Sequence, residues 1–215
     1  MKLVLHSYWR SSASHRVRIG LGLKQLPYDY VAINILQGEQ HADAYRAKNP
    51  MGQVPTLEVT DDDGDKITLT QSLAILEYLD ERWPDPPILP RDPFLRARAR
   101  ALAEIVNAGI QPLQNASTLK RVKALGGDEA HWIRPFIADG LAAFARGVAD
   151  VSGAFCVGDF PTIADCCLVP QLNGARRFQV DLEPFANLLA IEAHCLPLPA
   201  FADAMPHHQP DAVKS

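Results

Sequence analysis

Cysteine is scarce in this chain, and its positions argue against a thiol–disulfide reductase and against a zinc protein. The 215 residues contain 4 cysteines, no Cys-x-x-Cys pair and no cysteine before Cys156. A thiol–disulfide reductase needs a reactive cysteine in its first domain, so this class is disfavoured. The spacing of zinc ligands is also missing, and we expect no metal site. Buried free thiols are expected instead, at Cys156, Cys166, Cys167 and Cys195.

Neither an excess of basic charge nor a long apolar run is present. The 21 basic and 25 acidic side chains give a formal net charge of −4, which leaves no basic patch for nucleic acid. No apolar run reaches the length of a membrane span, and the first residues lack the apolar core of a signal peptide. With 47% apolar and 21% charged residues, the composition predicts a packed, soluble and cytoplasmic protein without nucleic-acid or membrane partners.

The first 82 residues alternate between strand-like and helix-like segments. Runs rich in β-branched and aromatic residues predict strands, and apolar residues at helical spacing predict helices. The predicted strands are 2–7, 28–33, 54–60 and 66–70, and the predicted helices are 12–26, 41–48 and 71–82. The order β-α-β-α-β-β-α predicts a small α/β domain over residues 1–82.

The rest of the chain is predicted to be helical. Five prolines in residues 83–93 exclude a helix interior there and predict a stiff linker. Residues 94–215 then form the predicted all-α domain. Its helices are predicted over 94–108, 111–125, 128–151 and 162–178, with shorter pieces from Pro184 and Leu198. Thr162 and Asp165 have the spacing of a capping box and predict the start of a buried helix.

Two adjacent hydroxyl residues, Ser11 and Ser12, lie between the first predicted strand and the first predicted helix. A serine at the start of a helix caps backbone N–H groups, and its hydroxyl can donate to an anion at the positive end of the helix dipole. A thiolate held there has a lowered pKa and is a nucleophile near neutral pH. Most such pairs are only caps, so the pattern alone leaves both interpretations open.

Longer segments of the chain together resemble the glutathione transferases, and most specifically their zeta class. The resemblance covers nearly the whole chain. It is carried by residues 10–19 (RSSASHRVRI), 49–57 (NPMGQVPTL), 71–79 (QSLAILEYL), 109–115 (GIQPLQN), 162–165 (TIAD), 168–171 (LVPQ), 175–178 (ARRF) and 209–211 (QPD). It implies the glutathione transferase fold, in which an α/β thioredoxin-like N-terminal domain precedes an all-α C-terminal domain.

The resemblance also implies glutathione as the co-substrate. A cis peptide bond before Pro55 would turn the backbone of Val54 outward to pair with the cysteinyl segment of glutathione. The helix start at Gln71 and Ser72 suits the γ-glutamyl carboxylate, although Ser72 is also explained as a plain N-cap. Further predicted contacts are Gln40, Gln111, Asn115 and Ser117. The last three are equally typical of exposed helix surfaces.

The catalytic region implied by the resemblance is the run Ser11, Ser12, Ala13, Ser14 and His15. Zeta members usually have cysteine at the position of Ala13 and tryptophan at that of His15. The alanine removes any protein thiol there, but glutathione itself supplies the attacking sulfur in the implied chemistry. His15 either tunes the site electrostatically or packs the helix.

The implied reaction is the cis–trans isomerisation of a small unsaturated dicarboxylate, maleylacetoacetate, to fumarylacetoacetate in tyrosine and phenylalanine catabolism by a homodimer. Arg177 is the main candidate for the substrate carboxylate, because a guanidinium pairs with a carboxylate bidentately. Secondary candidates are Arg10, Arg16 and Arg176. Alternatives are maleylpyruvate as the substrate, a general detoxifying transferase, and a binding protein that has lost catalysis.

Overall fold

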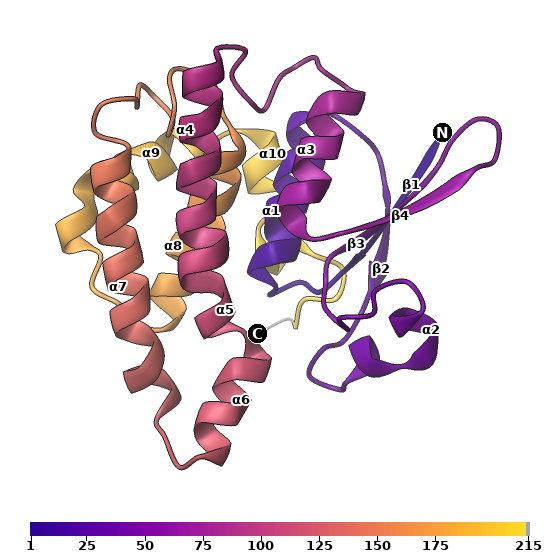
Figure 1. Cartoon of the computed structure of the whole chain (residues 1–215), viewed down its shortest axis with the longest axis horizontal. Coiled ribbons are helices and arrows are strands. Elements are labelled where there is room, and N and C mark those ends of the chain that lie inside the picture. Colours follow the sequence, from indigo (N-terminus) through magenta and orange to yellow (C-terminus); the bar gives the residue numbers. More distant parts are fainter. Residues whose placement is uncertain (214–215) are drawn as a thin grey trace. The chain divides into compact units, whose positions relative to one another are not determined.

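The structure is a computed structural model that describes residues 1–213 (Figure 1). It divides into two compact units. The first comprises Met1–Pro87 together with the C-terminal segment from Leu198, and the second comprises Ile88–Pro197. This division differs from the predicted boundaries, because the described part of the segment after 198 packs within the first unit.

A four-stranded mixed sheet in the order β2-β1-β3-β4 forms the centre of the first unit (Figure 1). Its strands are β1 (Lys2–Ser7), β2 (Asp29–Ala32), β3 (Thr56–Thr60) and β4 (Lys66–Thr70). β1 is parallel to β2 and antiparallel to β3, and β3 is antiparallel to β4. The helices of residues 1–87 are α1 (Ser12–Leu23), the 3-10 turn η1 (Glu39–His41), α2 (Asp43–Arg46) and α3 (Ser72–Arg82). The predicted order of strands and helices is confirmed.

Alternate residues of β1 and β3 face α1 and α3 and form the core of this unit. The buried cluster consists of Leu3, Leu5, Val17, Leu21, Leu57, Val59, Ile75 and Leu79. α1 and α3 approach closely at Gly20, where a Cβ atom would lie 2.1 Å from Cδ2 of Leu76. α1 ends at Leu23, three residues before its predicted end. The buried ammonium of the next residue, Lys24, donates to Asp80 at 2.8 Å and to the carbonyl oxygens of Trp83 and Pro86 at 2.7 Å.

The register of the sheet brings three functional segments to one edge. His6 at the end of β1 pairs with Thr56 at the start of β3, which in turn pairs with Thr70 at the end of β4. α1 follows β1, α3 follows β4, and the Val54–Pro55 bond comes just before β3. The N-termini of both helices and the segment before β3 therefore lie at the same edge.

The second unit is helical, as predicted (Figure 1). Its elements are α4 (Pro93–Glu104), the π-helix η2 (Ile105–Ile110), α5 (Gln111–Gln114), α6 (Ala116–Ala124), α7 (Glu129–Gly147), α8 (Ile163–Arg177), the 3-10 turn η3 (Glu183–Phe185) and α9 (Ala186–Cys195). The helix predicted over 111–125 is split, because Asn115 adopts an extended backbone with φ −60° and ψ 142°. None of the helices among residues 1–213 has the length and apolar character needed to cross a membrane.

The capping box at the start of α8 is confirmed. Oγ1 of Thr162 accepts from the Ala164 N–H, and the Asp165 carboxylate accepts from the Thr162 N–H at 2.7 Å and from the Cys156 N–H at 2.8 Å. Both capping residues are fully buried. The four cysteines are buried free thiols, as predicted. Burial raises the pKa of the Cys156 thiol well above its ordinary value.

Two short elements, α10 (Pro199–Ala202) and the 3-10 turn η4 (Pro206–His208), lie in the C-terminal segment of the first unit. α10 packs on α1 so closely that a Cβ atom at Gly22 would lie 2.9 Å from Cα of Ala200. The guanidinium of Arg18 on α1 donates twice to the carbonyl oxygen of Ala204. These contacts explain why the segment belongs to the first unit although it follows the helical one in sequence.

Removal of the cap hydroxyl in Thr162→Ala should lower the free energy of unfolding by about 1–2 kcal/mol, because buried N–H groups at the start of α8 lose their acceptor. The measurement is urea denaturation followed by circular dichroism. Thr162→Ser is the matched control, since it keeps the hydroxyl and loses only a methyl group. Equal losses in both variants would show that the cap bond contributes nothing.

Candidate functional site

The start of α1 places Ser11 and Ser12 at the functional edge of the sheet. Oγ of Ser11 accepts from the Ser14 N–H at 3.2 Å, which confirms Ser11 as the N-cap, and Ser12 is the first helical residue. Both residues are half-buried. A hydroxyl that accepts one hydrogen bond still has a hydrogen to donate. The cap therefore remains free to donate to an anion at the helix N-terminus.

The next residues of α1 turn toward the interior. Ala13 is half-buried, whereas Ser14 and His15 are buried and offer no surface to a ligand. Oγ of Ser14 and Nε2 of His15 have no hydrogen-bond partner among the described residues. Burial lowers the pKa of His15 well below its ordinary value, and the charges of Arg18 and Arg16 lower it further. An imidazole that is neutral at pH 7 favours the packing interpretation over an electrostatic one.

The peptide bond between Val54 and Pro55 is cis, as predicted. Within residues 1–213 the backbone N–H and C=O of Val54 make no hydrogen bond. The preceding carbonyl, that of Gln53, accepts from the Tyr45 hydroxyl at 2.6 Å and from Nδ2 of Asn49 at 2.7 Å. The loop is thus held from one side while the Val54 backbone groups remain available to an extended peptide.

The start of α3 differs from the predicted cap. The N-cap is Gln71, with φ 70° and ψ 115°, and its side chain makes no capping bond. Ser72 is the first helical residue, so the plain N-cap interpretation of Ser72 is wrong. Its Oγ accepts instead from Nη1 of Arg16 at 3.1 Å. Arg16 is 1% exposed, and in this structure it joins α1 to α3 rather than offering its guanidinium to a substrate.

Gln40 and Arg10 also lie in the first unit. Gln40 is half-buried, donates from Nε2 to the carbonyl oxygen of Ile35 at 3.3 Å, and has no partner for its buried Oε1 among the described residues. Its own carbonyl oxygen lies 2.9 Å from where a Cβ atom of Gly52 would be, which places Gln40 beside the loop that leads to Val54. Arg10 is exposed, with its guanidinium 5.4 Å from the centre of the Trp9 ring.

In the second unit, Gln111 and Asn115 belong to a chain of amide groups. Nε2 of Gln111 donates to Oδ1 of Asn115 at 3.1 Å, and Oε1 of Gln111 accepts from Gln114 at 3.1 Å. Gln114 exchanges two hydrogen bonds with Gln171 of α8, at 3.1 and 3.2 Å. Both residues of this pair are buried, and Ser117 is exposed outside the chain of amides. Sequence reasoning assigned no site role to Gln114 and Gln171, although both lie in the segments 109–115 and 168–171 that carry the resemblance.

Neighbouring arginines at the end of α8 have different environments. Arg176 pairs with both carboxylate oxygens of the buried Glu192, and its Nη1 lies 2.7 Å from Oε1. The guanidinium of Arg176 is thus engaged within the second unit, and its predicted secondary role in substrate binding stays a prediction. Arg177 is exposed, and its guanidinium lies 4.7 Å from the centre of the Phe178 ring.

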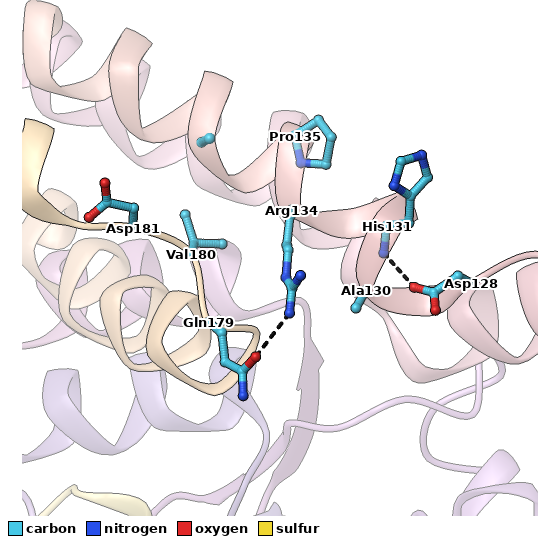
Figure 2. Close-up of a pocket in the computed structure, with 9 residues that line it drawn as sticks. Asp128, Ala130, His131, Arg134, Pro135, Gln179, Val180 and Asp181 are labelled. Carbon is cyan, nitrogen blue, oxygen red and sulfur yellow. Dashed lines mark hydrogen bonds between the residues drawn. The ribbon is translucent and has the colours of Figure 1, made fainter.

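A separate hollow of about 630 Å³ lies on the second unit between α7 and the segment after α8 (Figure 2). None of the predicted site residues lines it. In Figure 2, Arg134 extends from α7 toward Gln179, donating to its Oε1 at 3.0 Å and to the carbonyl oxygen of Phe178 at 2.7 Å. Arg134 thereby closes the C-terminal end of α8, just after Arg177.

The four-stranded mixed sheet, the cis proline before β3 and the all-helical second unit define a glutathione transferase fold. Residues 5–87 match the family model described as the N-terminal domain of glutathione S-transferase. The chain is 43% identical to the maleylacetoacetate isomerase of Dictyostelium discoideum, over 98% of this chain and 96% of that one. It is 44% identical to the maleylpyruvate isomerase of Ralstonia sp, over 97% of this chain and 99% of that one.

Solved structures agree with these relatives. The maleylacetoacetate isomerase of Anaeromyxobacter dehalogenans 2CP-1, with GSH bound in the active site, has a TM-score of 0.91 and 52% identity, over 99% of this chain and 98% of that one. The same protein with dicarboxyethyl glutathione and citrate has a TM-score of 0.91 and 51% identity over the same shares. The chain belongs to the zeta class of glutathione transferases, the family of the maleylacetoacetate isomerases.

The buried His15 should make the stability of the protein pH-dependent. Below pH ~6.5 the unfolded chain protonates this imidazole and the folded chain does not, so the free energy of unfolding falls by up to about 1.4 kcal/mol per pH unit. His15→Gln should reduce this loss of stability. The measurement is urea denaturation at about pH 7 and about pH 5, on either side of the ordinary histidine pKa. His207→Gln, which replaces an exposed histidine, is the control. An unchanged slope in His15→Gln would contradict the assignment.

Proposed function

We propose that the protein is a glutathione-dependent cis–trans isomerase whose substrate is maleylacetoacetate and whose product is fumarylacetoacetate. One observation carries this proposal. The hydroxyls at the start of α1, the Val54 backbone and the N-terminus of α3 lie at one edge of the sheet. The solved relatives that hold GSH and dicarboxyethyl glutathione support the same choice of ligands.

The chain's own groups fit glutathione along its length. The unpaired N–H and C=O of Val54 suit the extended cysteinyl segment, to which they would pair as an added strand. The N-terminus of α3 at Gln71 and Ser72 has backbone N–H groups for the γ-glutamyl carboxylate. Gln40 lies beside the loop that leads to Val54 and is the remaining proposed glutathione contact in the first unit. Bound there, glutathione supplies the nucleophilic sulfur, which adds to the double bond and turns it into a single bond. Rotation about this single bond and departure of the thiolate then give the trans isomer and regenerate glutathione.

Ser11 and Ser12 stabilise the ionised form of the glutathione thiol. Keeping a thiol of ordinary pKa, about 8.5, ionised at pH 7 requires about 2 kcal/mol of differential stabilisation. A hydroxyl that donates to a charged group contributes about 1.5–3 kcal/mol, and a helix N-terminus contributes about 0.3–1 kcal/mol. These two contributions cover the requirement without a cysteine at the position of Ala13.

Side chains of the second unit supply the remaining roles. Arg177 binds a carboxylate of the substrate, since its guanidinium is exposed and lies at the end of α8. In the structure Oδ1 of Asn115 accepts from Gln111, which leaves the Asn115 amide hydrogens to donate to the ligand. Ser117, on the exposed face of α6, is the remaining proposed contact. Arg10 is a secondary contact, because Trp9 supports its guanidinium.

A second candidate substrate is maleylpyruvate. The relative that carries this activity in its name is 44% identical, against 43% for the maleylacetoacetate isomerase of Dictyostelium discoideum. Turnover of both acids with and without glutathione decides between them, and turnover of neither refutes the proposal. Homodimerisation, a cytoplasmic location and a place in tyrosine and phenylalanine catabolism are part of the proposal on the strength of the family alone.

The hydroxyl pair should control the acidity of bound glutathione. The double variant Ser11→Ala, Ser12→Ala should lower kcat/KM by about a hundredfold, because the thiolate loses its charge-assisted hydrogen bond. The pKa of the bound thiol, measured by the ultraviolet absorbance of the thiolate, should rise in parallel. The single variants identify which serine donates. Unchanged acidity and turnover in the double variant would refute the assigned mechanism.

The adjacent arginines give a matched pair of substitutions. Arg177→Ala should raise KM for the dicarboxylate at least tenfold and leave glutathione affinity unchanged, because it removes a carboxylate contact worth about 1.5–3 kcal/mol. Arg176→Ala should leave KM unchanged and lower the free energy of unfolding, because it leaves the carboxylate of Glu192 buried without its partner. Steady-state kinetics and urea denaturation separate the two effects. The reverse pattern would assign the substrate to Arg176.

A further inference from the structure

The loop between β1 and α1 leads directly into the hydroxyl pair, and the backbone of Trp9 in this loop is held on both sides of its Cα atom. The N–H of Trp9 donates to Oδ2 of Asp211 at 3.0 Å. The carbonyl oxygen of the same residue accepts from Nη2 of Arg18 at 3.1 Å. Opposite charges thus hold the two peptide groups that flank the Cα atom of Trp9, two residues before Ser11.

Asp211 is itself held in one orientation. Its second oxygen, Oδ1, accepts from the Tyr30 hydroxyl on β2 at 2.7 Å. Burial raises the pKa of Tyr30 above its ordinary value, so the phenol remains a hydrogen-bond donor over the working range of pH. With one oxygen bound to the sheet and the other to the loop, the carboxylate cannot turn without losing a hydrogen bond.

Arg18 links the same loop to the same C-terminal segment. Its guanidinium is 2% exposed and donates to the carbonyl oxygen of Ala204 at 3.1 and 3.0 Å and to Oγ of Ser7 at 3.3 Å. Burial lowers its pKa to about 10, so that it is still a cation at neutral pH. The turn that carries Asp211 is closed by Gln209, which donates from Nε2 to the carbonyl oxygens of Asp203 and Met205 at 2.8 and 2.9 Å.

The held backbone of Trp9 determines the geometry of residues assigned to the site. Ser11 N–H donates to the carbonyl oxygen of Tyr8 at 3.0 Å, and the Trp9 ring supports Arg10. A shift of Trp9 would therefore move both the cap of α1 and the neighbouring arginine. Misplacement of a catalytic group by about 1 Å can cost a hundredfold in rate.

We propose that the C-terminal segment is a working part of the active site, in which Asp211 acts as a positioning residue that holds the loop before Ser11. This role accounts for the Gln209-Pro210-Asp211 motif, to which neither glutathione binding nor substrate binding assigns a task. The proposal deepens the proposed function and rests on the assignment of Ser11 and Ser12 to the thiol. Asp211 acts through the Trp9 peptide and touches no reacting atom.

The test is the substitution Asp211→Asn in the full chain. An amide has one acceptor oxygen where the carboxylate has two, so either the Trp9 N–H or the Tyr30 hydroxyl loses its partner. The pKa of the bound glutathione thiol, followed by ultraviolet absorbance of the thiolate, should rise by about one pH unit, with a loss of up to about tenfold in kcat/KM at pH 7. The matched control is Asp203→Asn in the same segment, an exposed carboxylate without a bond to the loop, which should leave both quantities unchanged.

A second variant, Tyr30→Phe, releases Oδ1 of Asp211 while the carboxylate stays in place, and it should raise the thiol pKa by a smaller amount. It decides the question if Asp211→Asn does not fold. A purely structural role predicts a lower melting temperature with an unchanged thiol pKa in both variants, and that result would overturn the proposal. A wild-type protein that lowers the pKa of bound glutathione but isomerises neither maleyl acid would refute the proposed substrate, while the thiol titration still tests Asp211.

Discussion

The antiparallel pairing of β1, β3 and β4 is the constraint on which the site depends. Since His6, Thr56 and Thr70 lie side by side, the chain must leave β1, enter β3 and leave β4 at one edge. Two of these segments continue as helices whose N-termini carry unsatisfied N–H groups, and the third carries the unpaired backbone of Val54. An elongated peptide with a carboxylate and a thiol meets a suitable partner at each of these points. A slip of β3 by one residue would turn Leu57 and Val59 out of the core and dismantle the arrangement.

Much of the first unit could be predicted from local pattern. Strand and helix order followed from apolar spacing, and the cis bond before Pro55 followed from a recognised motif. Helix ends were harder, because they depend on distant partners. The early end of α1 coincides with the turn of Lys24 toward Asp80 and two carbonyl oxygens more than fifty residues away, and no local signal carries that information.

The site residues, too, divide into those predictable from local pattern and those that depend on distant partners. The Ser11 cap is local and was predictable, whereas the burial of Ser14 and His15 depends on which face of α1 meets α3. Arg176 and Arg177 are adjacent and chemically identical, so sequence alone could rank them only by resemblance. Glu192 gives the two arginines different environments, because its carboxylate engages Arg176 through both oxygens.

The C-terminal segment shows why helical pattern alone does not assign a segment to a structural unit. Residues 198–213 follow a long helical stretch and contain further short helical turns, which assigned them to the helical domain. Their partners are charged or polar groups of the first unit, chiefly Arg18, Tyr30 and the Trp9 peptide. A buried guanidinium requires acceptors wherever it lies, and the Ala204 carbonyl oxygen meets that requirement. The burial of Arg18 on α1 therefore specifies a partner from the end of the chain, and the loop before Ser11 gains a fixed support as a result.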